Sequence, residues 1–390
     1  MISRSKVVVV DHPVGWAGIP YYFLKELKLM VDQVIILGDV SPAERINAAA
    51  RLANYRSSGR RYIPDRDVEL LHYRSERMRE RLAVHSDADA IIVFHPPDAA
   101  FLDTRIPIFI VHDATWRQFT DTYPGWSKSD LLEDSYLSGF STERTAFAKA
   151  KCLIFLTNWA ADSARNEYPE LRDKIRVVPP GANLPDEPAP SSIENALECR
   201  LKEPCQLLFV GYDTYRKGLD IAMEVTDCLR AKSIPAVLHV VGNAGREESL
   251  TVKTNNVRLH GRLDKTDRMS WSLLSQLYLE SFVFLFPSKA ECAGIVLCEA
   301  AAFGLPAVVP QVGGMPDIVL HGTTGYIVDA ITSPEKYADV IGKIWSDPVL
   351  YRTLSKNARE RYNQILNWKQ SIIKIINIIY NCATSCDCPA

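Results

Sequence analysis

The sequence predicts an α/β protein built from two doubly wound parallel sheets. Twelve short apolar runs alternate with longer segments of helical periodicity along the 390 residues. This alternation is typical of parallel sheets with helices on both faces, because each parallel strand needs a crossover connection to reach the next. A chain of this length also exceeds what one hydrophobic core usually supports, and so two domains are expected.

The predicted strands fall into two groups of six. The first group covers residues 6–11, 34–37, 90–94, 108–111, 152–156 and 176–178. The second group covers residues 206–210, 236–241, 256–259, 282–286, 307–309 and 326–328. Between the groups, residues 183–205 are polar and contain prolines, as a linker between domains should be. We therefore expect an N-terminal domain over residues 1–185 and a C-terminal domain over residues 205–365.

The composition argues against several kinds of partner. The formal net charge is −2, whereas a nucleic-acid-binding protein usually has a strongly basic face. No apolar run approaches the roughly 20 residues that a membrane-spanning helix needs. Nine cysteines are scattered along the chain without a secretory signal before them, so reduced thiols in the cytoplasm are the simplest interpretation. We interpret Cys382, Cys386 and Cys388 as part of a frayed tail, because a metal site would need a fourth ligand.

A basic region extends from Arg45 to Arg81. It contains ten arginines interleaved with tyrosines and leucines, and its pattern predicts a helix, a loop and a second helix. Two interpretations stay open. The arginines either form a solvated face paired with neighbouring acidic residues, or a basic amphipathic surface suited to a membrane surface or an anionic acceptor.

Two carboxylates flank a predicted strand-to-helix turn in the second half of the chain. Residues 282–286 form a short apolar run, and Gly294 opens an apolar stretch of helical length that starts with Ile295. Glu291 is expected in the loop and Glu299 about one turn inside the helix. Carboxylates in these places can accept hydrogen bonds from the hydroxyls of a sugar or ribose, while the free N–H groups at the helix start face a phosphate.

This segment resembles the donor-binding signature of retaining glycosyltransferases of family 4, whose fold, GT-B, has two Rossmann-like domains facing a central cleft. The family pattern P-S-x-x-E-x-x-G-x-x-x-x-E-A-x-A-x-G-x-P is filled by Pro287, Ser288, Glu291, Gly294, Glu299, Ala300, Ala302, Gly304 and Pro306. Residues 155–164, 177–184 and 207–225 resemble other parts of the family. The resemblance implies that the N-terminal domain binds the acceptor and is completed by a C-terminal helix at about residues 366–382. It also implies that the C-terminal domain binds a nucleotide sugar.

The resemblance also assigns roles at the start of the second domain. Gly211 ends a strand, and Lys217 lies where a helix starts, so that its charge would offset the negative charge on a departing diphosphate. The family usually has an arginine directly after the first glycine. Here that residue is Tyr212, and Arg216 is the nearest substitute.

The resemblance implies that the two glutamates bind different parts of the donor. Glu291 would accept hydrogen bonds from the sugar, and Glu299 would accept them from the ribose. Gly294 is retained where the backbone approaches phosphate, but Cys292 and Ala293 replace a glycine and an aromatic residue that are common in the family. Because Glu299 is flanked by apolar residues, we expect it to be partly buried with a ligand as its partner.

Three residues of the first domain are candidates by position. Gly15 and Gly18 follow the first strand and open a helix, where a GT-B enzyme's first domain meets the donor phosphate. His112 follows the strand at residues 108–111 and resembles the family's histidine that contacts the transferred sugar. A histidine at a strand end can equally be a satisfied structural residue. His95, at an equivalent strand end, is a weaker candidate.

The resemblance thus implies a retaining, hexosyl-type glycosyltransferase that moves a sugar from a nucleotide-diphosphate sugar to a glycan or lipid-linked acceptor. No cofactor and no metal are expected, because the Asp-x-Asp motifs at residues 65–67 and 87–89 do not follow a predicted strand. Two alternatives stay open: a non-catalytic member that binds a sugar nucleotide, and a nucleotide-sugar 2-epimerase, which would be expected to have an acidic-Ser-Gly-Gly turn at residues 287–290. The expected location is the cytoplasm, with peripheral contact with the inner membrane surface through the basic region.

Overall fold

The computed structural model describes residues 5–10, 18–38, 59–242, 256–329 and 333–384. The chain divides into two compact units, one of residues 1–179 with residues 371–390 and one of residues 180–370. Each unit contains a six-stranded sheet in which all paired strands are parallel. The predicted class, α/β with two parallel sheets, is therefore confirmed.

The sheet of the first unit has the strand order β2-β1-β3-β4-β5-β6. Its strands are β1 (Lys6–Val10), β2 (Gln33–Leu37), β3 (Ala90–Val93), β4 (Ile108–His112), β5 (Cys152–Phe155) and β6 (Ile175–Val177). The four residues of β3 and of β5 are buried, as expected for strands covered on both faces. The order reverses between β1 and β3, so this is the topological switch point of the first unit.

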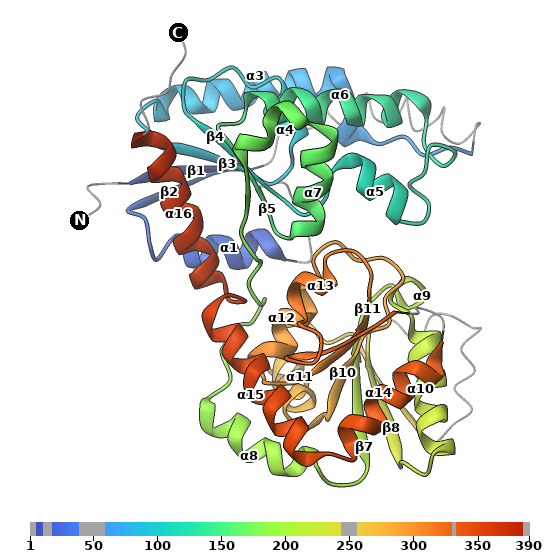
Figure 1. Cartoon of the computed structure of the whole chain (residues 1–390). Helices are drawn as coiled ribbons and strands as arrows, with labels where there is room; N and C mark the ends of the chain where they lie inside the picture. The colour runs from blue at the N-terminus through green and yellow to red at the C-terminus, as the bar shows by residue number, and fades with distance from the viewer. Residues whose placement is uncertain (1–4, 11–17, 39–58, 243–255, 330–332, 385–390) are drawn as a thin grey trace. The chain divides into compact units, whose positions relative to one another are not determined.

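Helices cover both faces of the first sheet (Figure 1). They are α1 (Ile19–Leu27), α3 (Val68–Leu82), α4 (Pro97–Ala100), α5 (Trp116–Thr122), α6 (Glu133–Lys149), α7 (Asn158–Glu167) and, from residue 371, α16 (Trp368–Thr384), with short 3₁₀ turns at Pro64–Arg66, Ala83–His85 and Pro169–Lys174. Met78 of α3 and Phe147 of α6 share one apolar core with Val8 and Ile91. Helix α1 lies on the opposite face of the sheet.

The sheet of the second unit has the strand order β12-β11-β10-β7-β8-β9. Its strands are β7 (Cys205–Val210), β8 (Ala236–Val241), β9 (Val257–Gly261), β10 (Val283–Leu285), β11 (Ala307–Pro310) and β12 (Gly325–Val328). The connections from β7 run outward to β9, and those from β10 run outward in the other direction to β12. The switch point is therefore between β7 and β10, which pair through Val283 and Leu207.

The helices of the second unit are divided between two cores. They are α8 (Pro190–Arg200), α9 (Thr214–Lys217), α10 (Leu219–Ala231), α11 (Arg268–Glu280), α12 (Ile295–Ala302), α13 (Met315–Ile318), α14 (Pro334–Trp345) and α15 (Pro348–Gln364). Leu207 of β7 packs with residues of α10 and α14, whereas its neighbour Leu208 packs with residues of α11 and α12. Successive residues of a strand point to opposite faces, so helices cover both sides of this sheet.

Helix α8 corrects the expectation that residues 183–205 form a linker. Its last residue, Arg200, is almost completely buried. The guanidinium donates hydrogen bonds to four carbonyl oxygens, those of Leu279 at 2.6 Å, Tyr278 at 3.0 Å, Phe303 at 2.9 Å and Gly304 at 2.9 Å. These carbonyls lie at the carboxyl ends of α11 and α12, where helical carbonyls lack partners within the helix. Arg200 thus caps two helices, and α8 is part of the second unit.

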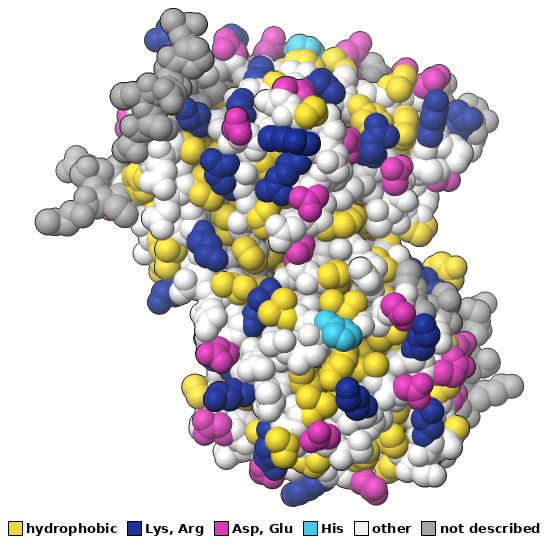
Figure 2. Space-filling model, in the orientation of Figure 1, with side chains coloured by type: hydrophobic (Ala, Val, Ile, Leu, Met, Phe, Trp, Pro, Cys, Tyr) yellow, Lys and Arg dark blue, Asp and Glu magenta, His cyan; other side chains and the backbone are white. Residues whose placement is uncertain are grey.

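The structure also corrects part of the expectation for the basic region, of which residues 45–58 lie outside the described residues. Arg66 and Arg74 are buried instead of lying on a basic face. Arg74 forms ion pairs with Asp98 at 2.6 Å and with Asp65 at 3.4 Å. On the face shown in Figure 2, basic side chains are interspersed with acidic and apolar ones. Among the helices that the structure describes, none has the length and apolar character needed to cross a membrane.

Candidate functional site

The switch point of the second unit brings together two loops that the sequence singled out. Ligands of open parallel sheets bind outside the carboxyl ends of the strands at such a point. The loop after β7 carries Gly211, Arg216 and Lys217, and the loop after β10 carries Glu291. Because β7 and β10 are neighbours, residues about 75 positions apart in the chain become adjacent here.

The loop after β7 is a short helix that ends in a tight turn. Lys217 is the last residue of α9 and lies two residues before the first residue of α10, so it is placed where a helix starts, as the sequence had suggested. The next residue, Gly218, has a φ of 78° and precedes the first residue of α10. A Cβ atom at this glycine would lie 2.2 Å from the carbonyl oxygen of Pro287. Glycine therefore permits both the left-handed turn and the close approach of the two loops.

Hydrogen bonds fasten the two loops together. The backbone N–H of Lys289 donates to the carbonyl oxygen of Arg216 at 2.8 Å. The guanidinium of Arg216 donates in return to the carbonyl oxygen of Ala290 at 2.8 Å and to Asp213 at 2.8 Å. The loops thus form one fixed scaffold, from which their side chains extend.

Lys217 and Glu291 form the ion pair at the centre of this scaffold. The ammonium nitrogen of Lys217 contacts Oε2 of Glu291, and Nη1 of Arg216 lies 4.0 Å from the same oxygen. Both partners are mostly buried, with 14% of the Lys217 side chain and 12% of the Glu291 side chain exposed. Burial lowers the pKa of Lys217, and the charge of Glu291 opposes that shift. The site therefore keeps two cations and one carboxylate away from bulk water.

The helix that follows the second loop begins beside Glu291. Gly294 has a φ of 68° and immediately precedes α12, whose first residue is Ile295. Oε1 of Glu291 accepts a hydrogen bond from the backbone N–H of Gly294 at 3.3 Å. The start of α12, with its N–H groups that lack partners within the helix, thus lies next to the Lys217 ion pair. This is the arrangement that suits an anion such as a phosphate.

Glu299 lies inside α12 and has protein partners that the sequence did not predict. Its side chain is only 2% exposed, and Oε1 contacts the ammonium nitrogen of Lys265. Oε2 accepts a hydrogen bond from the hydroxyl of Tyr278 at 3.1 Å. Lys265 follows β9, and its ammonium group also donates to the carbonyl oxygen of Asn183 at 3.0 Å. The expected partly buried carboxylate is therefore present, but a lysine and a tyrosine bind it in the structure.

Lys265 was missed because it is separated from Glu299 by 34 positions and belongs to no recognisable motif. Two signals could have led to it. A carboxylate flanked by apolar residues needs a cation when it is buried, and Lys265 follows a strand at the ligand-binding edge of the sheet.

Of the candidates of the first unit, the structure describes Gly18, at the start of a helix, and His112, at the end of a strand. Gly15 lies outside the described residues. Gly18 precedes α1 with a φ of 79° and makes no side-chain cap. His112 is the last residue of β4, and burial together with the charge of Arg66 lowers its pKa well below the ordinary value for histidine. The imidazole is therefore neutral near pH 7.

His95 follows β3 and joins a buried polar group in the first unit. Nη1 of Arg66 lies 3.3 Å from Nε2 of His95. Because a guanidinium can only donate, Nε2 accepts, and the proton of a neutral His95 is on Nδ1, which lies 3.4 Å from Asp98. Burial lowers the pKa of His95. Arg66, His95 and Asp98 thus form one connected polar group at this edge of the first sheet.

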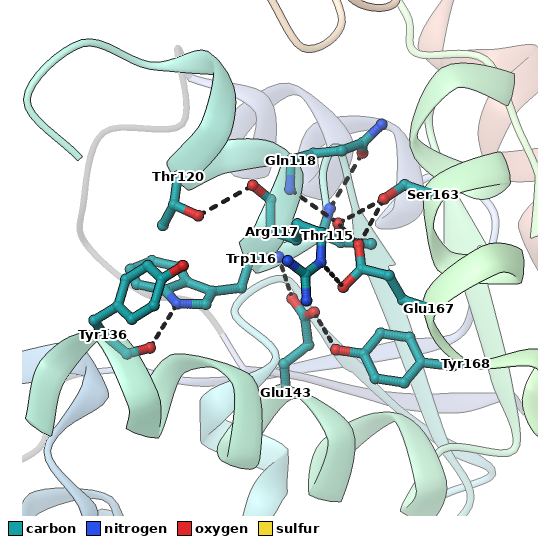
Figure 3. A network of polar contacts seen from close by, with 10 residues as sticks. All are labelled: Thr115, Trp116, Arg117, Gln118, Thr120, Tyr136, Glu143, Ser163, Glu167 and Tyr168. Carbon is teal, nitrogen blue, oxygen red and sulfur yellow. Dashed lines mark hydrogen bonds and ion pairs between the residues drawn. The ribbon is translucent and has the colours of Figure 1, made fainter. Parts of the chain in front are cut away.

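A second polar network of the first unit surrounds the start of α5 (Figure 3). Oε2 of Glu143 accepts a hydrogen bond from the backbone N–H of Trp116 at 2.8 Å, and Oε1 accepts one from the hydroxyl of Tyr168 at 2.8 Å. Burial raises the pKa of Glu143 to about 7. Thr115 caps the same helix and contacts Glu167 at 2.9 Å. No sequence motif indicated this network, because its members come from three separate elements.

Comparison with known proteins associates the second unit with a family. Residues 198–361 match the family model for group 1 glycosyl transferases. The D-rhamnosyltransferase WbpZ of Pseudomonas aeruginosa is 30% identical over 202 residues, which are 50% of this chain and 50% of that protein. The lipopolysaccharide glucosyltransferase WaaG of Escherichia coli is 28% identical over 246 residues, 58% of this chain and 62% of that protein. The alignments thus span about half to three fifths of these relatives.

A solved structure extends the likeness to the fold of the whole chain. Anabaena HepE, crystallised with UDP and glucose, superposes with a TM-score of 0.65 at 14% identity and covers 97% of this chain and 100% of that chain. The chain therefore has the GT-B fold that the sequence predicted. The family match begins at residue 198 and so includes the buried Arg200 as well as both loops of the switch point.

Proposed function

We propose that this protein is a retaining glycosyltransferase, which moves a hexose-type sugar from a nucleotide-diphosphate sugar to a glycan or lipid-linked acceptor. The observation that carries the proposal is the Lys217–Glu291 ion pair at the switch point, beside the start of the helix that holds Glu299. This constellation lies inside the region that is similar to group 1 glycosyltransferases.

The diphosphate of the donor fits the two cations. In the structure Glu291 neutralises Lys217 and lies 4.0 Å from Arg216. A diphosphate carries more negative charge than one carboxylate and would compete with Glu291 for both side chains. Its oxygens could also accept hydrogen bonds from the first N–H groups of α12, next to Gly294 and Ile295. Glu291, once displaced, would be available to accept hydrogen bonds from the sugar.

The same cations support the chemical step. We propose that an acceptor hydroxyl oxygen bonds to the anomeric carbon on the face from which the diphosphate departs. A phosphate oxygen of the leaving group takes the acceptor proton, so the anomeric configuration is retained. Negative charge grows on the diphosphate as its bond to the sugar breaks, and Lys217 with Arg216 stabilises that charge in a mostly buried site. The role of His112 as a contact to the transferred sugar stays a prediction.

The relatives support the class of donor and acceptor. One is named a lipopolysaccharide glucosyltransferase, which supports a lipid-linked acceptor, and a structural neighbour was solved with UDP and glucose. We propose a cytoplasmic location, which the free cysteines among the described residues support. Contact with a membrane surface would involve the exposed arginines of the basic region, such as Arg77 on α3.

A thermal screen with UDP, GDP, ADP and dTDP provides the first test. A ligand that binds only the folded state raises the midpoint of unfolding by mass action, so at least one diphosphate should do so. Product analysis with the matching nucleotide sugar then separates the alternatives. A transferase releases the diphosphate when an acceptor is present, an epimerase interconverts nucleotide sugars, and a binding protein does neither.

Changing each of the two glutamates to glutamine should impair a different step, either binding of the diphosphate or turnover of the donor. Glu299→Gln should lower the affinity for the free diphosphate by roughly tenfold or more, because charge-assisted hydrogen bonds to the ribose are each worth about 1.5–3 kcal/mol. Glu291→Gln removes the charge that competes with the diphosphate for Lys217 and Arg216, so it should not lower that affinity, but it should lower turnover of the intact donor. Calorimetric titration and steady-state kinetics measure both effects. Equal losses of diphosphate affinity in the two variants would contradict this division.

A further inference from the structure

Glu299 is bound on both oxygens before any ligand arrives. Lys265 contacts Oε1, and the hydroxyl of Tyr278 donates to Oε2 at 3.1 Å. Tyr278 is itself fully buried and stacks on Phe303, with ring centroids 4.9 Å apart. The carboxylate therefore cannot rotate freely, and its orientation is set by two elements outside α12.

Lys265 is the more accessible partner of this carboxylate. Its side chain is 24% exposed, whereas that of Glu299 is 2% exposed. Its ammonium group has three N–H donors, of which Glu299 takes one and the carbonyl oxygen of Asn183 takes another at 3.0 Å. Of the two partners of Glu299, the lysine is thus the one that solvent can reach.

A buried carboxylate such as Glu299 needs a partner of opposite charge. Removing a charge from water costs several kcal/mol unless a partner of opposite charge offsets it. Within the described residues, Lys265 is the cation recorded in contact with Glu299. The ion pair with Lys265 and the hydrogen bond from Tyr278 therefore hold the buried carboxylate in one orientation.

We propose that Lys265 is a positioning residue of the donor site, which pairs with the Glu299 carboxylate and holds it in the orientation that binds the ribose of the nucleotide. This inference rests on the proposed function, because it takes a ribose as the ligand of Glu299. Lys265 acts through Glu299, so its effect on the nucleotide disappears when the carboxylate is removed. Neither the sequence motif nor the family pattern includes this lysine.

A double-mutant cycle tests the proposal on the full chain. The diphosphate that stabilises the protein most among UDP, GDP, ADP and dTDP is titrated calorimetrically into the wild type, Lys265→Met, Glu299→Gln and the double variant. Each single change should weaken binding by about tenfold or more. The double variant should bind about as weakly as the weaker single variant, because residues that act through one another do not add.

Two further variants separate positioning from folding. Lys265→Arg keeps the positive charge and should bind the diphosphate within about threefold of the wild type. Lys336→Met is the matched control, since it removes the exposed ion pair with Asp329 in the same unit and should leave the affinity unchanged. If Lys265→Met unfolds, the double variant, which leaves no unpaired carboxylate, still tests the proposal, because it should bind the diphosphate about as weakly as Glu299→Gln alone.

Each outcome decides between the two proposals. If none of the four diphosphates stabilises the wild type, the proposed function fails. If a diphosphate binds the wild type and folded Lys265→Met equally well, the role of Lys265 is wrong and the proposed function stands. The proposal would also be overturned if the losses of diphosphate affinity in the two single variants multiply in the double variant. That result would mean that Lys265 binds the ligand independently of Glu299.

Discussion

At the scale of single residues, the charge of Lys217 carries the proposed chemistry. Burial lowers its pKa and Glu291 opposes that shift, so the lysine is held in a place where water is largely excluded. Electrostatic interactions are stronger in such a place than in water. A cation fixed there costs no reorganisation when charge develops on the leaving diphosphate.

Lys217→Ala should therefore lower the turnover number by about 10² or more while the protein still folds. Transfer is measured by release of nucleoside diphosphate, and folding by circular dichroism and thermal unfolding. Lys232→Ala, which removes an exposed ion pair with Asp339, is the control and should be fully active. Unchanged turnover in Lys217→Ala would remove this lysine from the mechanism.

Glu143 makes the stability of the first unit depend on pH. Its folded-state pKa is raised to about 7 by burial, whereas an unfolded glutamate titrates near about 4.3. Between these values the folded state holds a proton that the unfolded state has released. The stabilisation is therefore complete below about pH 4.3 and is lost as the pH rises toward about 7.

Glu143→Gln should remove this loss. The free energy of unfolding of the variant minus that of the wild type should increase by roughly 3 kcal/mol at most between pH 5 and pH 7. Above pH 7 this difference should level off. Urea unfolding at pH 5, 6, 7 and 8 measures the difference. Glu170→Gln, in the exposed pair with Arg144, is the control. Parallel pH profiles for Glu143→Gln and the wild type would show that the raised pKa has no effect on stability.

At the scale of elements, helix α8 is fixed by its last residue. Arg200 donates to four carbonyl oxygens at the ends of α11 and α12 and is buried with them. A cation at the carboxyl end of a helix also interacts favourably with the helix dipole, and here one guanidinium does so for two helices.

Arg200→Met should lower the free energy of unfolding by at least about 3 kcal/mol, because several buried carbonyl groups lose their donors. Arg200→Lys should fall between the wild type and Arg200→Met, since an ammonium group lacks the planar fork that reaches both helix ends. Urea unfolding of the full chain measures this. Arg230→Met is the control, because Arg230 donates a single hydrogen bond from an exposed side chain. A loss no larger than that of the control would contradict the capping role.

The strands could be predicted from the sequence, and α8 could not. The twelve strands that the structure describes lie within about two residues of their predicted positions, because strands of a parallel sheet, and the central buried ones above all, appear as short apolar runs. Helix α8 is mostly polar, so no apolar stripe marked it, and its most buried residue is an arginine that binds carbonyls about 80 and 100 positions away. Lys265 could not be predicted for the same reason, since its partner is remote in the chain.

At the scale of the whole molecule, the proposed chemistry needs no metal ion. The sequence offers two Asp-x-Asp motifs, and both have structural partners. Asp67 caps α3 through the N–H groups of Glu69 and Leu70, and Asp87 forms an ion pair with Lys6. Lys217 and Arg216 supply the positive charge that a divalent ion supplies elsewhere.

Transfer should therefore persist in excess EDTA. Activity is compared before and after treatment with the chelator, with the metal content of the treated protein measured by mass spectrometry. Full activity in the metal-free protein is the expected result. Loss of activity that magnesium or manganese restores would show that a divalent ion takes part in the reaction.

The position of Arg200 also decides where this protein could be recombined with its relatives. A chimera that takes its second unit from Cys205, the start of β7, would inherit α11 and α12 without the arginine that caps them. The other parent of the chimera would then have to supply an arginine at the position of Arg200. Otherwise the carbonyl groups at the ends of α11 and α12 would lack their donor. A crossover placed before Pro190 moves the arginine together with the helices it binds. We therefore expect the second unit to be exchangeable between relatives only when α8 moves with it.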